Sequence, residues 1–152
     1  MVSTIKSLPW LKQIKQQAVE YSAYSDRELR DASLDLAHES RRLDKIAQLL
    51  VRGFALVQTA ATRQLQMTHY DVQFLGGKSM CDGHVVEMRT GEGKTLTATL
   101  PASCAAMAGM PVHVVTVNDY LVERDARLMR PVYERLGLTV GHVIEGMDTA
   151  QR

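Results

Sequence analysis

The residues best suited to chemistry lie in one run, Met-Arg-Thr-Gly-Glu-Gly-Lys-Thr, at positions 88–95. Gly91 and Gly93 lack a Cβ atom, so the backbone there can turn sharply and bring its N–H groups against an anion. Lys94 is long enough to reach the β- and γ-phosphates of a nucleotide, and the Thr95 hydroxyl can bind Mg²⁺. We therefore predict a phosphate-binding loop. Its residues are Thr90, Gly91, Glu92, Gly93, Lys94 and Thr95.

The first position of this loop departs from the general pattern G-x-x-x-x-G-K-[ST], because Met88 stands where glycine is expected. A non-glycine residue there is typical of helicase-like motors of superfamily 2. The alternative is a glycine-rich turn that contains Lys-Thr by chance. The flanks favour the loop, since residues 85–88 read as a buried strand and residues 96–100 as the start of a helix.

Strands and helices are expected to alternate on both sides of the loop. Apolar runs predict strands at 85–88, 113–117 and 139–143, and helices are expected at about 94–108 and 119–136. Gly76-Gly77 and Asp82-Gly83 indicate turns around a short segment. The predicted fold class is thus α/β, with a partial RecA-like parallel sheet and flanking helices. A nucleotide would lie at the carboxyl ends of its strands.

The front of the chain is expected to be helical. Apolar residues at helical spacing predict one helix that begins near Ser7 or Pro9 and another at about 46–65. Between them, Ser25 and Glu28 form a capping box that opens a helix toward Ser40, followed by a polar break at 38–42. Gly53 lies beside an apolar stripe, which suggests close approach by another element. We predict a helical region at 1–66 and a nucleotide-binding region at 67–152.

Composition narrows the class of protein. With 152 residues, the chain has the size of one domain, and its formal net charge of +1 gives no support for nucleic-acid binding. Cys81 and Cys104 lack metal-ligand spacing and are expected to be reduced thiols. No membrane span or cleavable leader is expected, so the predicted location is cytoplasmic.

A second group of residues adds specificity to the loop. The amide of Gln73 can pair with the N6/N7 edge of adenine, although a glutamine before two glycines means little alone. Gln73, the loop and residues 115–121 and 124–125 form a combination. This combination resembles the SecA family of protein-export motors. The resemblance covers most of the chain, including the helical front at 50–63, and is most specific over 71–125.

The resemblance implies an ATP site and a set of partners. Gln73 would read adenine, Met67 and Tyr70 would pack near the base, and Thr95 would hold magnesium. Thr116 and Arg124 would couple nucleotide state to movement. A preprotein would be the substrate, and a homodimer is left open.

The resemblance also implies a membrane-facing role for the first helix. Lys6, Lys12 and Lys15 make that helix basic, so it would meet acidic phospholipid and the Sec translocation channel at the inner membrane of a bacterium. The simpler interpretation of these lysines, which we weight more heavily, is a solvated helix face.

The sequence departs from the family in length. SecA-like motors are several times longer, and their magnesium-binding and water-activating carboxylates lie on an acidic strand that would follow Arg152. We therefore predict that this chain binds ATP weakly and does not hydrolyse it. With few strands present, we also expect an unpaired sheet edge, and hence a fragment, self-association or marginal stability.

Two alternatives stay open at this stage. One is a nucleic-acid helicase fragment of superfamily 2. The other is a truncated, non-catalytic interaction module that binds a partner through its helical front.

Overall fold

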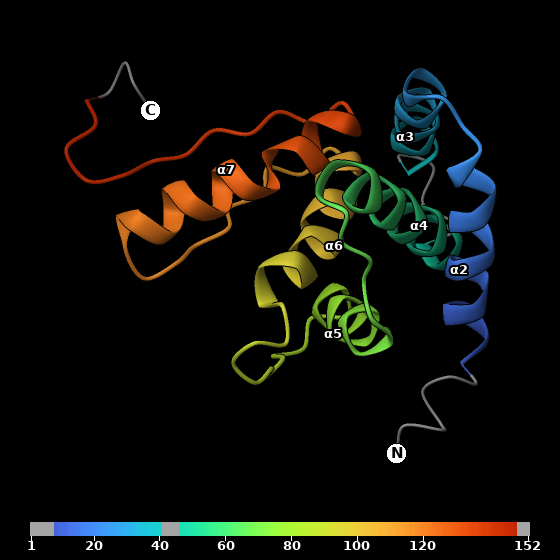
Figure 1. The fold of residues 1–152 in the computed structure, drawn as a ribbon, viewed down its shortest axis with the longest axis horizontal. Coiled ribbons are helices and arrows are strands. Elements are labelled where there is room, and N and C mark those ends of the chain that lie inside the picture. Colours follow the sequence, from blue (N-terminus) through green and yellow to red (C-terminus); the bar gives the residue numbers. More distant parts are fainter. Residues whose placement is uncertain (1–7, 41–45, 149–152) are drawn as a thin grey trace.

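Residues 8–40 and 46–148 are described by a computed structural model of the chain (Figure 1). Within these ranges the regular elements are α2 (Pro9–Ser22), α3 (Asp26–Ser40), α4 (Ile46–Leu65), α5 (Asp71–Cys81), α6 (Lys94–Met107) and α7 (Asp119–Arg135). Five of these helices confirm the helices predicted from the sequence. Lys6, Ser7 and residues 41–42 of the predicted break lie outside the described ranges.

The predicted parallel sheet is wrong. Residues 85–88, 113–117 and 139–143 are extended, but neither described range contains a β-strand. An extended segment becomes a strand only when a neighbouring segment accepts and donates its backbone hydrogen bonds. In the described part of the chain these three runs do not pair with one another, so the partial RecA-like α/β sheet is replaced by an all-helical arrangement.

The side chains of the extended runs show the same result. Val85, Val115 and Val117 are almost fully exposed, with Val115 at 88% and Val117 at 87%. Their β-branched side chains fit a pleated surface that is half covered by neighbours, and here that cover is absent. The valine-rich pattern therefore indicates segments that could pair as strands, although no segment in the described residues pairs with them.

Helices α2 and α3 both pack against α4. Leu11, Ile14, Ala18 and Tyr21 line the buried face of α2 against α4. The capping box that opens α3 is confirmed, because the Ser25 N–H donates to Glu28 Oε2 at 2.6 Å and the Glu28 N–H donates to Ser25 Oγ at 3.3 Å. The Ser25 N–H first, and the Ser25 hydroxyl second, lower the pKa of the Glu28 carboxyl.

Arg63, in the last turn of α4, locks the turn between α2 and α3. Its Nη2 atom donates to the carbonyl oxygens of Tyr21 at 3.1 Å, Ser22 at 3.2 Å and Tyr24 at 2.5 Å. Its Nη1 atom pairs with Asp26 Oδ1 at 3.1 Å. One planar guanidinium thus binds carbonyls at the end of α2 and in the turn that follows it.

Helix α4 is the centre of the molecule and packs against α2, α3, α6 and α7 (Figure 1). Phe54, Val57 and Ala61 are fully buried on it. The close approach predicted at Gly53 is confirmed, because a Cβ atom built there would lie 2.6 Å from Cys104 Sγ on α6. Helix α4 packs against helices from both predicted regions, 1–66 and 67–152. The division into these two regions stays a prediction.

The turn predicted at Gly76-Gly77 is wrong, because both glycines lie inside α5. They allow α5 to approach α6 closely: a Cβ atom on Gly77 would lie 3.0 Å from Leu100 and 3.3 Å from Phe54. This packing holds a helix that the glycines themselves disfavour by about 1 kcal/mol each. The turn at Asp82-Gly83 is confirmed.

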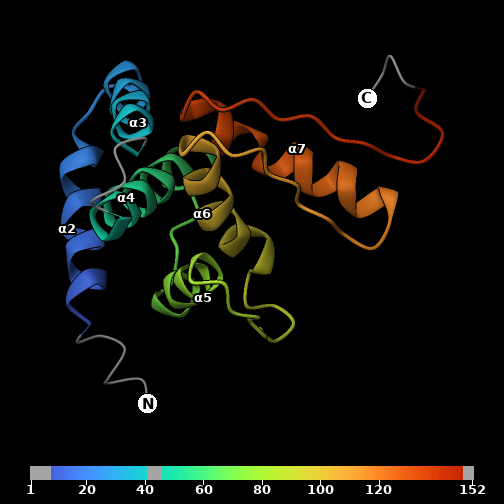
Figure 2. The same cartoon turned by 180° about the vertical axis from the view of Figure 1, so that it is seen from behind.

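Helix α7 is buried mainly through its C-terminal half. Met129 and Val132 on α7 and Leu136 just after it are buried, whereas the N-terminal end of α7 extends away from the other helices (Figures 1 and 2). The segment after α7 runs back along it, because Arg130 Nη1 donates to the Val140 carbonyl at 2.7 Å. Among the described helices, none combines the length and the apolar content needed to cross a membrane.

Candidate nucleotide-binding site

The predicted phosphate loop is an exposed turn that leads directly into α6. Gly91 and Gly93 have φ angles of +88° and +78°, a backbone region that side chains with a Cβ atom rarely adopt. The Gly93 carbonyl accepts hydrogen bonds from the N–H and the hydroxyl of Thr97, at 2.9 and 3.0 Å. The loop therefore lies at the N-terminus of α6, where the partial positive charge of a helix favours an anion.

The charged side chains of the loop bond to its backbone. Lys94 Nζ donates to the Arg89 carbonyl at 2.8 Å, and the Arg89 N–H donates to Glu92 Oε2 at 2.7 Å. The Lys94 ammonium thus lies across the loop, and it is exposed to solvent. Because the ammonium is exposed, it can give up its hydrogen bond to the Arg89 carbonyl and bind phosphate oxygens instead.

Gln73 joins α5 to the loop. Its Oε1 atom accepts the Tyr70 N–H at 2.9 Å, and its Nε2 atom donates to the Glu92 carbonyl at 2.9 Å and the Gly93 carbonyl at 3.4 Å. The side chain is 3% exposed. The structure therefore brings Gln73 to the loop, with its amide holding the backbone of the loop.

Thr95 meets a residue that sequence reasoning did not assign to the site. Its hydroxyl donates to Asp125 Oδ2 on α7 at 3.4 Å, and Arg124 holds the other oxygen of that carboxylate at 2.6 and 2.8 Å. A hydroxyl beside a carboxylate is an oxygen-only set that suits Mg²⁺, which keeps several of its waters. The residues present thus fit magnesium, although the described residues contain no group of three or more His, Cys, Asp or Glu side chains able to enclose a metal.

The two residues expected beside the base lie on the connection into α5. Met67 is 42% exposed and Tyr70 is 74% exposed, so both are free to contact a planar ligand. Thr116 lies further along the chain, in an extended segment, where its hydroxyl accepts the Val117 N–H at 2.8 Å. The described structure shows no contact between Thr116 and the loop.

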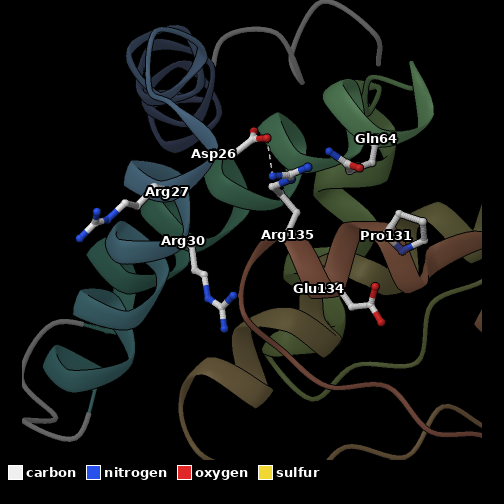
Figure 3. Close-up of a pocket in the computed structure, with 7 residues that line it drawn as sticks. All are labelled: Asp26, Arg27, Arg30, Gln64, Pro131, Glu134 and Arg135. Carbon is white, nitrogen blue, oxygen red and sulfur yellow. Dashed lines mark ion pairs between the residues drawn. The ribbon is translucent and has the colours of Figure 1, made fainter.

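A pocket of about 500 Å³ lies elsewhere, between α3, the end of α4 and α7 (Figure 3). It is lined by Asp26, Arg27, Arg30, Gln64, Pro131, Glu134 and Arg135. Arg135 pairs with Asp26 at 2.5 Å, so the same carboxylate binds Arg135 and Arg63. These charges hold α3 against α7, and none of the predicted loop residues lines the pocket.

Comparison with known proteins adds to this geometry. The SecA DEAD-like domain family matches residues 3–152. The chain belongs to the SecA family. It is 56% identical over 131 residues to a protein named Protein translocase subunit SecA 2, from Bordetella avium (strain 197N), a match that covers 80% of this chain and 20% of that protein.

Two further SecA relatives show the same likeness. Over 131 residues the chain is 50% identical to the protein translocase subunit SecA of Cellvibrio japonicus (strain Ueda107), covering 86% of this chain and 14% of that protein. Over 147 residues it is 46% identical to the SecA of Synechococcus sp. (strain JA-3-3Ab), covering 97% and 15%. The chain therefore spans between 14% and 20% of the length of these SecA relatives.

Proposed function

We propose that this chain is the ATP-binding part of a preprotein translocase ATPase that drives protein export through the Sec channel. The observation that supports this most directly is the loop Gly91–Thr95 at the N-terminus of α6, tied by Gln73 to α5, in a chain of the SecA family. The family match also counts against the two alternatives, a nucleic-acid helicase and a non-catalytic interaction module.

Each site residue has a proposed task. The backbone of Thr90–Gly93 cradles the phosphates, Lys94 neutralises their charge, and Thr95 binds magnesium with waters. Magnesium, when bound, neutralises charge on the phosphate oxygens. Met67 and Tyr70 supply apolar surface beside the base, in keeping with their exposure.

Adenine recognition by Gln73 has a structural condition. Both polar atoms of its amide are engaged with Tyr70 and Glu92, and the side chain is buried. To pair with adenine, the amide must exchange at least one of these partners for the base. Because the same amide holds Glu92, reading the base would also loosen the loop.

The 152-residue chain is proposed to bind Mg-ATP without hydrolysing it. Hydrolysis needs a group that orients the attacking water as well as one that holds the metal. Among the described residues, Asp125 is the carboxylate bonded to Thr95, and Arg124 holds its other oxygen. A Lys94-dependent ATPase activity of the purified chain would contradict this part of the proposal.

Partners and location are proposed for the longer protein. A cytoplasmic protein that binds the inner membrane peripherally would present α2 to acidic phospholipid and to the channel. In the structure, Lys12 is exposed on α2, while Lys15 pairs with Asp71 at 2.5 Å. Preprotein as substrate and a homodimer are likewise proposals.

The test is thermal unfolding with and without Mg-ATP. Ligand at 100 times its Kd stabilises the folded chain by about 2.7 kcal/mol. We expect this shift in the wild type and its loss in Lys94→Ala. Lys78→Ala is the matched control, because Lys78 on α5 pairs with Asp82 just after that helix and, within the described part of the chain, forms no ion pair with the loop. A wild type without any shift, or a shift retained in Lys94→Ala, would refute the proposed site.

A further inference from the structure

His69 is a buried histidine that connects the segment before α5 to α6. Its side chain is 4% exposed and its ring lies 5.5 Å from the ring of Phe74, centroid to centroid. The Nε2 atom lies 3.1 Å from the carbonyl oxygen of Leu96, in the first turn of α6. Sequence reasoning gave this residue no role.

The hydrogen bond fixes the tautomer of the ring. A carbonyl oxygen only accepts, so Nε2 carries the proton and Nδ1 is left as an acceptor. Nδ1 is buried, and no donor in the described part of the chain reaches it. A buried acceptor without a donor costs free energy. Phenylalanine would fill much the same space without this cost, so packing alone does not account for a histidine here.

The position of the bond gives it a consequence for the loop. Gln73 holds the carbonyl of Glu92, just before α6, and His69 holds the carbonyl of Leu96, just after Thr95. Lys94 and Thr95 lie between these two attachment points. The loop and the first turn of α6 are therefore tied twice to one short segment, residues 69–73.

We propose that His69 is a positioning residue of the nucleotide site. Its hydrogen bond to Leu96 fixes the first turn of α6, and thereby sets the direction from which Lys94 and Thr95 meet phosphate and magnesium. His69 itself does not touch the nucleotide. This inference rests on the proposed ATP site, which it deepens.

The structure also indicates that a variant at this position can fold. The Leu96 carbonyl accepts a second hydrogen bond, from Thr99 Oγ1 at 2.6 Å. Loss of the histidine donor therefore does not leave this carbonyl unsatisfied. His69→Phe keeps an aromatic ring beside Phe74 and removes the tether to Leu96, together with the 3.4 Å contact between His69 Nε2 and Thr99 Oγ1 on the same helix.

The experiment compares His69→Phe with His69→Gln in the full chain. The Gln Nε2 atom reaches about as far as the His Nε2 atom and can donate to the same carbonyl. Two quantities are measured: the Kd for Mg-ATP, and amide hydrogen exchange of residues 96–98 without nucleotide. We expect His69→Phe to raise the Kd about tenfold and to speed exchange about tenfold, while His69→Gln stays within about threefold in both. Phe74→Leu, which alters packing in the same place, is the control and should leave the exchange of residues 96–98 within about threefold.

The outcomes separate this inference from the proposed function. If the wild type binds no Mg-ATP, the proposed function fails, and exchange alone then decides whether His69 holds α6. If residues 96–98 exchange as slowly in His69→Phe as in the wild type, the inference is overturned, whatever the Kd for Mg-ATP. Equal effects of His69→Phe and His69→Gln also overturn it, because a merely space-filling ring would give that result.

Discussion

Replacing Gly93 with alanine tests the contact between Gln73 and the loop. Gly91 and Gly93 both have positive φ angles, so alanine at either position incurs a similar backbone cost. Their surroundings differ. A Cβ atom on Gly91 meets nothing within 4 Å, whereas one on Gly93 would collide with Gln73 Nε2. Gly91→Ala is therefore the matched control.

The magnitudes follow from this difference. A left-handed conformation costs an alanine roughly 1–2 kcal/mol, and the stiffer unfolded chain returns about 0.4–1 kcal/mol. Gly91→Ala should thus lower the free energy of unfolding by about 1 kcal/mol. Gly93→Ala must in addition displace the buried Gln73 amide from Glu92, which costs a further ~1–3 kcal/mol.

The assay is equilibrium urea unfolding of the 152-residue chain, followed by far-ultraviolet circular dichroism. A double-mutant cycle with Gln73→Ala isolates the contact. In the Gln73→Ala chain, Gly93→Ala should cost no more than Gly91→Ala. The reasoning is refuted if the two alanines cost the same in the wild-type chain, or if removing the Gln73 side chain leaves the cost of Gly93→Ala unchanged.

Three further predictions concern packing, charge and pH. Gly53→Ala should destabilise the fold by about 1–3 kcal/mol in urea unfolding, because its Cβ atom would lie 2.6 Å from Cys104 Sγ, and Cys104→Ala should relieve the effect. Arg63→Lys should cost about 1–3 kcal/mol in the same assay, since the single nitrogen of an ammonium cannot bind both Asp26 and the three carbonyls, as Nη1 and Nη2 of Arg63 do; a loss below about 0.5 kcal/mol would contradict this. Burial lowers the pKa of His69 from 6.5 to about 4, so the unfolded chain takes up its proton first. The contribution of His69 to the free energy of unfolding should therefore be fully present above pH 6.5 and fall by about 3 kcal/mol toward pH 4. Urea midpoints for His69→Phe should lack this fall.

Local patterns in the sequence predict the helices well. Two short-range signals are Pro9 at a first helical position and the capping box of Ser25 and Glu28. Both helices that they predict are confirmed. Strands depend on distant partners. Residues 113–117 carry the valine pattern of a strand, but no segment within 8–40 or 46–148 pairs with them. Helix α5 is missed for the opposite reason, because its glycines signal a turn locally while Leu100 and Phe54 favour close helix packing.

The candidate site divides in the same way. The loop from Thr90 to Thr95 is recognisable because its residues are consecutive, and the structure places it at the start of α6. Asp125 is 30 residues from Thr95 along the chain, so only the folded arrangement brings it to the hydroxyl. His69 is equally hidden, since a single histidine carries no spacing signal.

Arg63 also bears on the order in which the chain can assemble during synthesis. Its guanidinium reaches carbonyls 39–42 residues earlier in the chain. At about 5–20 residues per second, the ribosome adds this stretch in roughly 2–8 seconds. Through that interval α2 and α3 exist without the side chain that fixes the turn between them. The turn between α2 and α3 is thus completed only when the last turn of α4 has been made.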